Sequence, residues 1–391
     1  MDFLDAPALP FYFTPEHEGL RATLRAFVAR EITPHVNDWD EAQTFPRALY
    51  ARVAELGVLG LGYPEELGGT PADLFYQLVV AEEFARCGSG GVQASLNSHS
   101  IALPPILKAG SADLQRRVVP PVLRGEKIAA LAVTEPSGGS DVAHLRTTAV
   151  REGAHYLLNG EKTFITSGVR ADFLTVAVRT DPAVLGAGGI SVLLVDGDTP
   201  GLTRTPLQKM GWWSSDTAHL RFENCRVPVA HLVGEEHRGF KLLMENFNSE
   251  RLLLAALACG YAEVCLHEAL DWTRQRMVGG SPLAERQVVR HKLVDMALRI
   301  DAARALLYEL AWRIEHRAAR PAQLVARVCM AKVQATQAMQ FCADQAVQLL
   351  GGMGFMRGTK SERIYREVKV MMIGGGAEEV MKDLAARQLG L

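Results

Sequence analysis

Residues 131–168 read LAVTEPSGGSDVAHLRTTAVREGAHYLLNGEKTFITSG, and we take this stretch as the centre of the chain's organisation. The apolar run 128–133 leads into TEPSGGSD (134–141), whose small residues let a backbone approach a ligand and whose hydroxyl and N–H groups can bind anions. Two β-like runs follow, joined by Asn159-Gly160, a strong hairpin signal. The pattern predicts a strand, a polar loop and a hairpin that hold the loop against a flat or anionic ligand. A solvent loop between two strands is the favoured alternative on composition alone.

Length and composition are those of an ordinary globular protein. The 391 residues are enough for two or three domains, and 48% of them are hydrophobic. The 42 basic residues nearly balance the 44 acidic ones. The near-neutral balance, without a basic stripe, argues against nucleic acid as a partner. The sequence shows no uninterrupted apolar run of about 18 residues, so no membrane span is expected.

The cysteines and the opening residues indicate a reducing compartment. Six cysteines lie far apart without a C-x-x-C motif, so we expect thiols that serve as small core residues in a cytoplasmic protein. The opening segment, MDFLDAPALPFYF, is acidic and lacks arginine, unlike a secretory signal or a mitochondrial presequence. There is no HExxH motif or Cys/His cluster, so no metal is expected.

Two motifs carry a family resemblance. TEPSGGSD matches the TEP-x-x-GSD signature of the acyl-CoA dehydrogenases, and NGEKTFITSG (159–168) matches that family's NG-x-K-x-[WF]-I-T-x-[GA] segment. Two motifs in the right order within about 40 residues are far more specific than either alone. The chain therefore resembles an acyl-CoA dehydrogenase, over nearly its whole length.

The order of the expected elements agrees with this resemblance. Helical periodicity over residues 14–128 gives way to short β runs between about 129 and 235, and then to long helical patterns at 239–276, 284–318 and 322–350. The resemblance implies an α+β fold with three domains: an N-terminal helical domain (1–128), a central β domain (129–238) and a C-terminal four-helix-bundle domain (239–391). It also implies a homotetramer, arranged as a dimer of dimers and built through the last domain.

The reaction implied is the α,β-dehydrogenation of a fatty acyl-CoA thioester to the trans-2-enoyl-CoA. FAD is the implied cofactor, accepting a hydride at N5, and an electron-transferring flavoprotein is the implied electron acceptor. In many members the base is a Glu near the C-terminus, in a motif like YEGTSE. The corresponding segment here is IGGGAEE (373–379), which has Gly375 at that position.

A minority of the family, including isovaleryl-CoA and long-chain acyl-CoA dehydrogenases, has its base in a motif like ERLLxA. Residues 250–255 read ERLLLA, so the resemblance implies Glu250 as the base and hints at a branched or longer acyl chain. From the residues alone, Glu250 is a helix-start carboxylate stabilised by the helix dipole. The sequence leaves open whether Arg251 lowers the pKa of Glu250 or burial raises it.

The remaining implied contacts carry over position by position. The N–H of Gly375 would donate to the thioester carbonyl together with a ribityl hydroxyl of FAD, and Ser140 and Arg251 would contact substrate. Implied FAD contacts within the subunit are Leu131, Val133, Thr134, Ser140, Phe164, Thr166, Ala377 and Glu379. Implied contacts to the FAD of a neighbouring subunit are Arg276, Gln287, Gln348, Gly351 and Gly352. Without the family, Arg276 is a solvated helix-end charge and Gln348 a helix-surface amide.

Two positions depart from the family pattern. Gly279 replaces a Phe that contacts FAD, and Ala377 replaces a hydroxyl residue near the flavin phosphates. Two other functions stay open: a flavin oxidase or monooxygenase on the same fold, and a non-catalytic acyl-CoA or flavin-binding protein. Glu250 is the residue that separates an enzyme from a binding protein.

Overall fold

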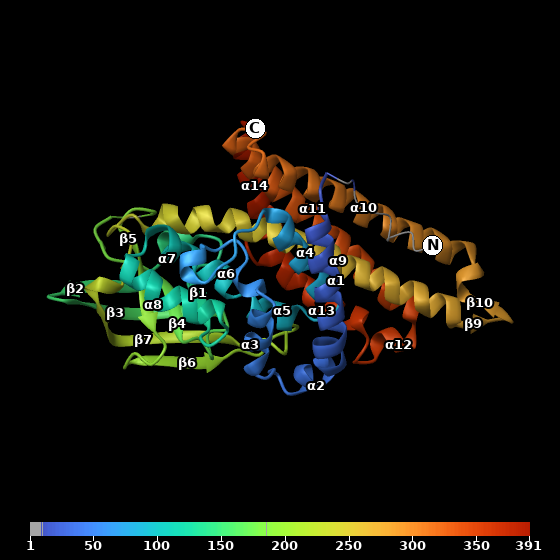
Figure 1. The fold of residues 1–391 in the computed structure, drawn as a ribbon, viewed down its shortest axis with the longest axis horizontal. Coiled ribbons are helices and arrows are strands. Elements are labelled where there is room, and N and C mark those ends of the chain that lie inside the picture. The colour runs from blue at the N-terminus through green and yellow to red at the C-terminus, as the bar shows by residue number, and fades with distance from the viewer. Residues whose placement is uncertain (1–8, 10, 185) are drawn as a thin grey trace.

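The computed structural model describes residue 9, residues 11–184 and residues 186–391, which excludes most of the opening segment considered above. Helices form both ends of this part of the chain, and the sheet lies between them in sequence and beside the long helices in space (Figure 1). The expected α+β class is confirmed: an N-terminal helical region, a middle β region and a C-terminal helical region. The division into three domains at 128/129 and 238/239 stays a prediction.

Short helices build the N-terminal region. The first begins at Pro15 after the N-cap Thr14, and His17 completes a capping box with Thr14. Helix α4 is buried over most of its surface because both α1 and α9 pack against it. The helices are α1 (Pro15–Phe27), α2 (Val36–Glu41), α3 (Ala48–Glu55), α4 (Leu74–Ala85), α5 (Gly90–Leu96), α6 (His99–Ala102), α7 (Pro104–Ala109) and α8 (Ala112–Leu123).

One sheet forms the middle region. Its order is β6-β7-β3-β2-β4-β5-β8, and β1 pairs in parallel with β4. Strands β4 and β5 are apolar on both faces because alternate residues contact α6–α8 on one side and the remaining strands on the other. The strands are β1 (Ala129–Ala132), β2 (Thr148–Glu152), β3 (His155–Thr166), β4 (Phe173–Arg179), β5 (Ile190–Asp196), β6 (Leu202–Pro206), β7 (Thr217–Pro228) and β8 (Leu232–Val233).

The predicted hairpin at Asn159-Gly160 is wrong. Strand β3 continues through these residues, and its register with β7 shifts there, between Leu158 and Gly160, without a break in the strand. The hairpin lies earlier, between β2 and β3, where Gly153 has φ +61°. Gly160 is needed for a close approach instead, since a Cβ there would lie 2.6 Å from the Cα of Thr147. A bulge glycine within a strand produced the same sequence signal as a turn glycine.

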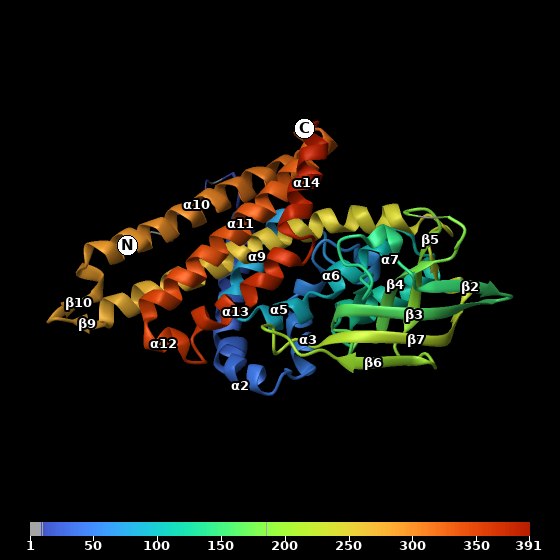
Figure 2. The same cartoon turned by 180° about the vertical axis from the view of Figure 1, so that it is seen from behind.

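Long helices form the C-terminal region. They are α9 (Gly239–Gln275), α10 (Gln287–Glu315), α11 (Pro321–Leu350), α12 (Gly352–Phe355), α13 (Lys360–Ile373) and α14 (Glu378–Leu389), with a short hairpin of β9 (Met277–Val278) and β10 (Ser281–Pro282) after α9. Helix α9 begins beside the sheet and runs to the opposite end of the molecule, where β9, β10 and α12 lie (Figure 2). Helices α9, α10, α11 and α13 pack together, and α14 packs on α11.

Helix α9 is a core helix. Its most apolar 18-residue window has a mean hydropathy of 1.4, so length and composition alone would allow it to cross a membrane, but 61% of that window is buried inside the fold. Small residues allow close packing along it: a Cβ on Gly260 would lie 2.7 Å from the Cβ of Ala85 in α4. All six cysteines are free and buried, as expected of thiols that act as small core residues.

Candidate active site

A buried ion pair joins the two sequence motifs. Nζ of Lys162, from β3, donates to Oε1 of Glu135 at 2.8 Å and to the carbonyl oxygen of Val133 at 2.9 Å. The Lys162 side chain is fully buried. Burial lowers the pKa of Lys162 to about 8, whereas Lys162 holds the pKa of Glu135 below its usual value despite the burial of that carboxylate. The pair fixes the end of β1 against β3.

Glu135 also closes the polar loop that follows it. Its carboxylate accepts hydrogen bonds from the backbone N–H groups of Arg146, at 2.6 Å, and Thr147, at 2.9 Å. The loop between these anchors therefore starts and ends on one carboxylate. Ser140 is exposed on this loop, so its hydroxyl can reach a ligand. Neither Glu135 nor Lys162 was predicted from the sequence to have a role, although both belong to the two family motifs.

Phe164 occupies a strained position beside the same strand end. Its φ is +60°, its side chain is 69% exposed, and the β3–β7 register shifts between Lys162 and Ile165. A bulky residue at positive φ is an outlier of the kind that clusters at binding sites. Thr163 N–H donates to the carbonyl of Thr134 at 2.9 Å, and the Thr134 hydroxyl donates back to the carbonyl of Thr163 at 2.6 Å.

These contacts bring the expected ring-binding residues to one edge of the sheet. Leu131, Val133 and Thr134 lie at the end of β1, and Phe164 and Thr166 lie on the adjacent part of β3. An exposed aromatic ring next to a strand end and a polar loop fits a flat aromatic group with an anionic tail, as FAD is. The residues present thus fit the implied cofactor.

Glu250 lies in the interior of α9, eleven residues after Gly239, the first residue of the helix. The interpretation of Glu250 as a helix-start carboxylate is therefore wrong. Its Oε2 atom is buried and has no hydrogen-bond partner in the described part of the chain. Burial raises the pKa of Glu250 to about 7, and the positive charges of Arg251 and Lys332 offset this only in part. Burial therefore decides the question that the sequence left open, and the carboxylate is poised to take a proton near neutral pH.

Gly375 lies directly opposite Glu250. A Cβ at position 375 would be 3.8 Å from Oε1 of Glu250 and 2.7 Å from Cδ1 of Leu254. Gly375 also has φ +66°, which a residue with a Cβ adopts only with strain. Arg251 Nε donates to the Gly375 carbonyl at 2.9 Å, whereas the N–H of Gly375 finds no acceptor among the described residues. That N–H is free to polarise a carbonyl oxygen.

Lys332 lies close to the site but was not predicted from the sequence to belong to it. Its side chain is fully buried on α11, and Nζ donates to the carbonyl oxygens of Met372, at 3.1 Å, and Gly376, at 2.8 Å. The available signal was a lysine inside an otherwise small and apolar stretch of helix, since Ala331, Lys332, Val333 and Ala335 are all buried.

The residues expected to reach a neighbouring subunit do not join this site. Arg276 ends α9, Gln287 begins α10, and Gln348 is in the last turn of α11, all at the end of the bundle away from the sheet (Figure 2). Gly351 and Gly352 lie there too, at the start of α12. Arg276, Gln287 and Gln348 are exposed, and the Arg276 side chain forms no hydrogen bond or ion pair within the described ranges. Their expected cofactor role needs a second subunit.

The remaining expected cofactor residues, and the positions that depart from the family pattern, lie at the start of α14 or in the turn between β9 and β10. Ala377 is the N-cap of α14 and Glu379 is exposed in its first turn. Gly279 has φ +61° in the turn between β9 and β10, so the glycine suits the turn better than the Phe of the family would.

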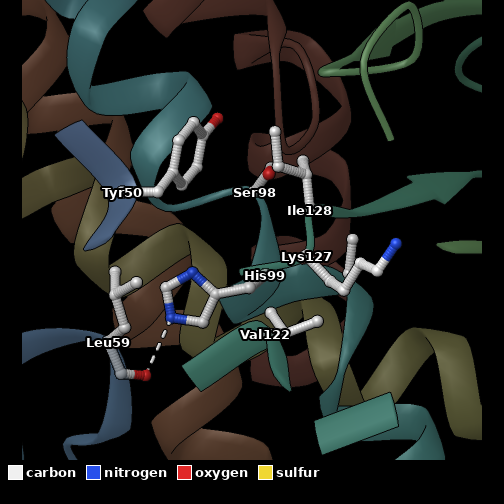
Figure 3. Close-up of a pocket in the computed structure, with 8 residues that line it drawn as sticks. Tyr50, Leu59, Ser98, His99, Val122, Lys127 and Ile128 are labelled. Carbon is white, nitrogen blue, oxygen red and sulfur yellow. Dashed lines mark hydrogen bonds between the residues drawn. The ribbon is translucent and has the colours of Figure 1, made fainter. Parts of the chain in front are cut away.

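A separate narrow pocket lies between the N-terminal helices and the sheet, and Figure 3 shows His99 at its centre. The Nε2 atom of His99 is 3.0 Å from the carbonyl oxygen of Leu59, and Nδ1 is 3.1 Å from that of Leu96. Burial lowers the pKa of His99 to about 4, so the ring is neutral at physiological pH. The pocket is too narrow to admit a water molecule, and His99 serves as a core side chain.

Family models match almost all of the chain. The model of the acyl-CoA dehydrogenase N-terminal domain matches residues 14–126, that of the middle domain residues 130–225, and that of the C-terminal domain residues 237–390. The chain belongs to the acyl-CoA dehydrogenase family. Members of this family are FAD-dependent oxidoreductases that act on CH–CH bonds of acyl-CoA substrates, so the chain belongs among flavin enzymes.

Known members agree in sequence and structure. The human mitochondrial short-chain specific acyl-CoA dehydrogenase is 37% identical over 375 residues, covering 95% of this chain and 90% of that protein. The acyl-CoA dehydrogenase structure from Geobacillus kaustophilus is 38% identical, with a TM-score of 0.92 and coverage of 97% and 99%. A Mycobacterium smegmatis glutaryl-CoA dehydrogenase in complex with FADH2 is 26% identical, with a TM-score of 0.90 and coverage of 97% and 95%.

Proposed function

We propose that this acyl-CoA dehydrogenase oxidises a fatty acyl-CoA to the trans-2-enoyl-CoA with Glu250 as its base. The observation that carries the proposal is that Oε2 of Glu250 is buried and has no hydrogen-bond partner among the described residues. The carboxylate lies beside Gly375, which has no side chain that could act as a base. Neither a structural ion pair nor a solvated surface charge accounts for this setting, because a buried carboxylate normally has its oxygens hydrogen-bonded. A perturbed pKa in such a place is typical of a catalytic group.

Two residues of the chain act on the substrate, one on its α-proton and the other on its thioester carbonyl. Ionised Glu250 takes the α-proton of the thioester, which becomes acidic when the thioester carbonyl is polarised. The N–H of Gly375 donates to that carbonyl oxygen, while Arg251 binds the Gly375 carbonyl and so holds this part of the loop. The residues that would hold FAD are Leu131, Val133, Thr134, Phe164 and Thr166, and the bound flavin would supply the acceptor, N5, for the β-hydride. Ser140 and Arg251 are the proposed substrate contacts.

We also propose that the active enzyme is a homotetramer, a dimer of dimers. The proposal is supported by the position of Arg276, Gln287 and Gln348 at the end of the bundle away from the sheet (Figure 2). An electron-transferring flavoprotein is the proposed electron acceptor. Cytoplasmic location and the three domains 1–128, 129–238 and 239–391 belong to the same proposal.

The function is tested with purified protein and a panel of acyl-CoA thioesters of different length and branching. A yellow protein that bleaches on anaerobic addition of an acyl-CoA, and regains colour slowly in air but rapidly with an electron-transferring flavoprotein, is the expected result. Rapid reoxidation by oxygen would identify an oxidase instead. Failure to bleach with any member of the panel would favour a binding protein.

A further inference from the structure

A buried ammonium holds the loop that carries Gly375. Residues 374–377 join α13 to α14, and Lys332 reaches the 374–376 loop within this connection from α11. Its Nζ binds the carbonyl oxygen of Met372 before the loop, at 3.1 Å, and that of Gly376 within it, at 2.8 Å. The first of these is an orphan carbonyl of the last turn of α13, which a lysine commonly satisfies. The second lies outside any helix, so capping alone does not explain the contact.

Together with Arg251, this ammonium fixes the orientation of the loop's peptide groups. Arg251 Nε binds the carbonyl of Gly375 at 2.9 Å, between the two carbonyls that Lys332 binds. Gly375 and Gly376 both have positive φ, +66° and +114°, and glycines have many alternative conformations. Three carbonyls held on two buried cations restrict a loop that its own sequence leaves free.

The same ammonium belongs to a cluster of charged and titratable groups around Glu250. The charged and titratable groups that face one another there are Glu250 and Arg251 from α9, Cys329 and Lys332 from α11, and Glu378 from α14. Burial and the Arg251 charge lower the pKa of Lys332 to about 8, so the ammonium is mostly protonated near pH 7. A positive charge at Lys332 favours the ionised form of Glu250.

We infer that Lys332 is a positioning residue for this active site, which holds the 374–376 loop with its Gly375 N–H toward the substrate and adds a positive charge to the cluster around Glu250. The inference rests on the proposed role of Glu250 as base. Lys332 does not touch the reacting atoms in this account. It acts through the Gly375 peptide and through charge.

The test compares Lys332→Met, Lys332→Arg and a matched control, Lys209→Met, in the FAD-loaded enzyme. Lys209 is a partly buried ammonium that likewise binds the backbone carbonyls of a loop, those of Trp212 and Ser215, and the carboxylates that act on it are Asp216, Glu367 and Asp40 rather than Glu250. Two quantities are measured for each variant against pH: the limiting rate of anaerobic flavin reduction by the fastest acyl-CoA of the panel, and the ionisation of Glu250. The ionisation is read by infrared difference spectroscopy, with Glu250→Gln identifying the band.

Lys332→Met is expected to move the Glu250 titration, and with it the acid limb of the rate profile, upward by about one pH unit, because the loss of a nearby positive charge disfavours the ionised form of a buried carboxylate. The rate at high pH should still fall by about tenfold or more, since the carbonyl donor is less well positioned. Acyl-CoA affinity should change much less. Lys332→Arg should restore the titration, and Lys209→Met should leave it where it is.

The inference is overturned if Lys332→Met holds FAD but leaves both the Glu250 titration and the limiting rate unchanged. It is equally overturned if Lys209→Met moves the titration as far as Lys332→Met does. Should Lys332→Met fail to fold, Lys332→Gln, which keeps a donor but loses the charge, must show the shifted titration. If Glu250→Gln reduces its flavin at the wild-type rate, the proposed function fails, while the infrared titration still reports separately on Lys332.

Discussion

The ammonium of Lys162 and the carboxylate of Glu135 form a buried ion pair at 2.8 Å, so the two motifs that mark this family are one structural unit. Glu135 extends the unit to the backbone of Arg146 and Thr147. The polar loop with Ser140 and the strand with Phe164 are thus held in a fixed relation. A cofactor that spans both would depend on this pair.

Lys162→Met is expected to lower stability by about 3–5 kcal/mol, because it leaves a buried carboxylate without its partner. FAD content should fall as well, since the loop loses its anchor. Thermal unfolding of the apoprotein at fixed concentration measures the first effect, and flavin absorbance after gel filtration the second. Arg124→Ala, which removes the exposed pair with Glu126, should change neither. Equal losses in both variants would contradict the account of the pair.

Leu254 is expected to decide whether the base can be moved to position 375. In Glu250→Gln/Gly375→Glu the new Cβ meets Leu254 Cδ1 at 2.7 Å, and the backbone at +66° strains any side chain. This double variant should recover only part of the flavin-reduction rate. Adding Leu254→Ala should raise that rate further, by about tenfold, because it removes the clash but not the strain. No gain from Leu254→Ala would show that the backbone alone excludes a Glu there.

Arg276→Ala is expected to loosen FAD more than it alters the chemistry. A guanidinium bound to a pyrophosphate is a charge-assisted contact of defined geometry. Flavin content after gel filtration should fall, while the flavin that remains should be reduced at a near-normal rate. Arg274→Ala is the matched control, because it removes an exposed arginine from the same helix end. Full retention of FAD by Arg276→Ala would count against the assignment.

The assembly should have four times the 42.7 kDa mass of the chain in light scattering. Arg276 and Gln348 have a cofactor role only if another subunit brings them to an FAD, and a closed symmetric assembly achieves this. Phe355, in α12 at the same end of the bundle, is 89% exposed in the single chain and is expected to be covered by a neighbour. Phe355→Asp should therefore reduce the mass. A single-chain mass with FAD fully bound would contradict the proposal.

Much of the fold could be predicted because the hydrophobic periodicity of the helices was clear and Pro and Gly residues marked the ends of many elements. The long helices α9, α10 and α11 were expected within a few residues of their observed bounds, and the short strands of the middle region were expected between about residues 129 and 235. The hairpin at Asn159-Gly160 failed because a glycine chosen for close approach to Thr147 gives the same local signal as a turn. Local sequence does not say which long-range neighbour a glycine serves.

The candidate site was predicted in part. Motif spacing pointed to Glu250 and Gly375, and the structure brings them together. Lys332 and Leu254 were missed because their relevance depends on packing between α9, α11 and the 374–376 loop, which no short motif encodes. The pKa of Glu250 could not be predicted either, since burial and the opposing charges act through three dimensions.

The most direct test of the account is the rate of anaerobic flavin reduction in Glu250→Gln. The amide keeps the shape of the side chain but cannot accept the α-proton, so the rate should fall by at least about 10²-fold. FAD content and acyl-CoA binding should change little. Glu245→Gln, the same change at an exposed carboxylate earlier on α9, should reduce its flavin at the wild-type rate. The wild-type rate should rise with pH through about 7 as Glu250 ionises, and Glu250→Gln should lack this limb. If Glu250→Gln reduces its flavin as fast as the wild type, Glu250 is not the base.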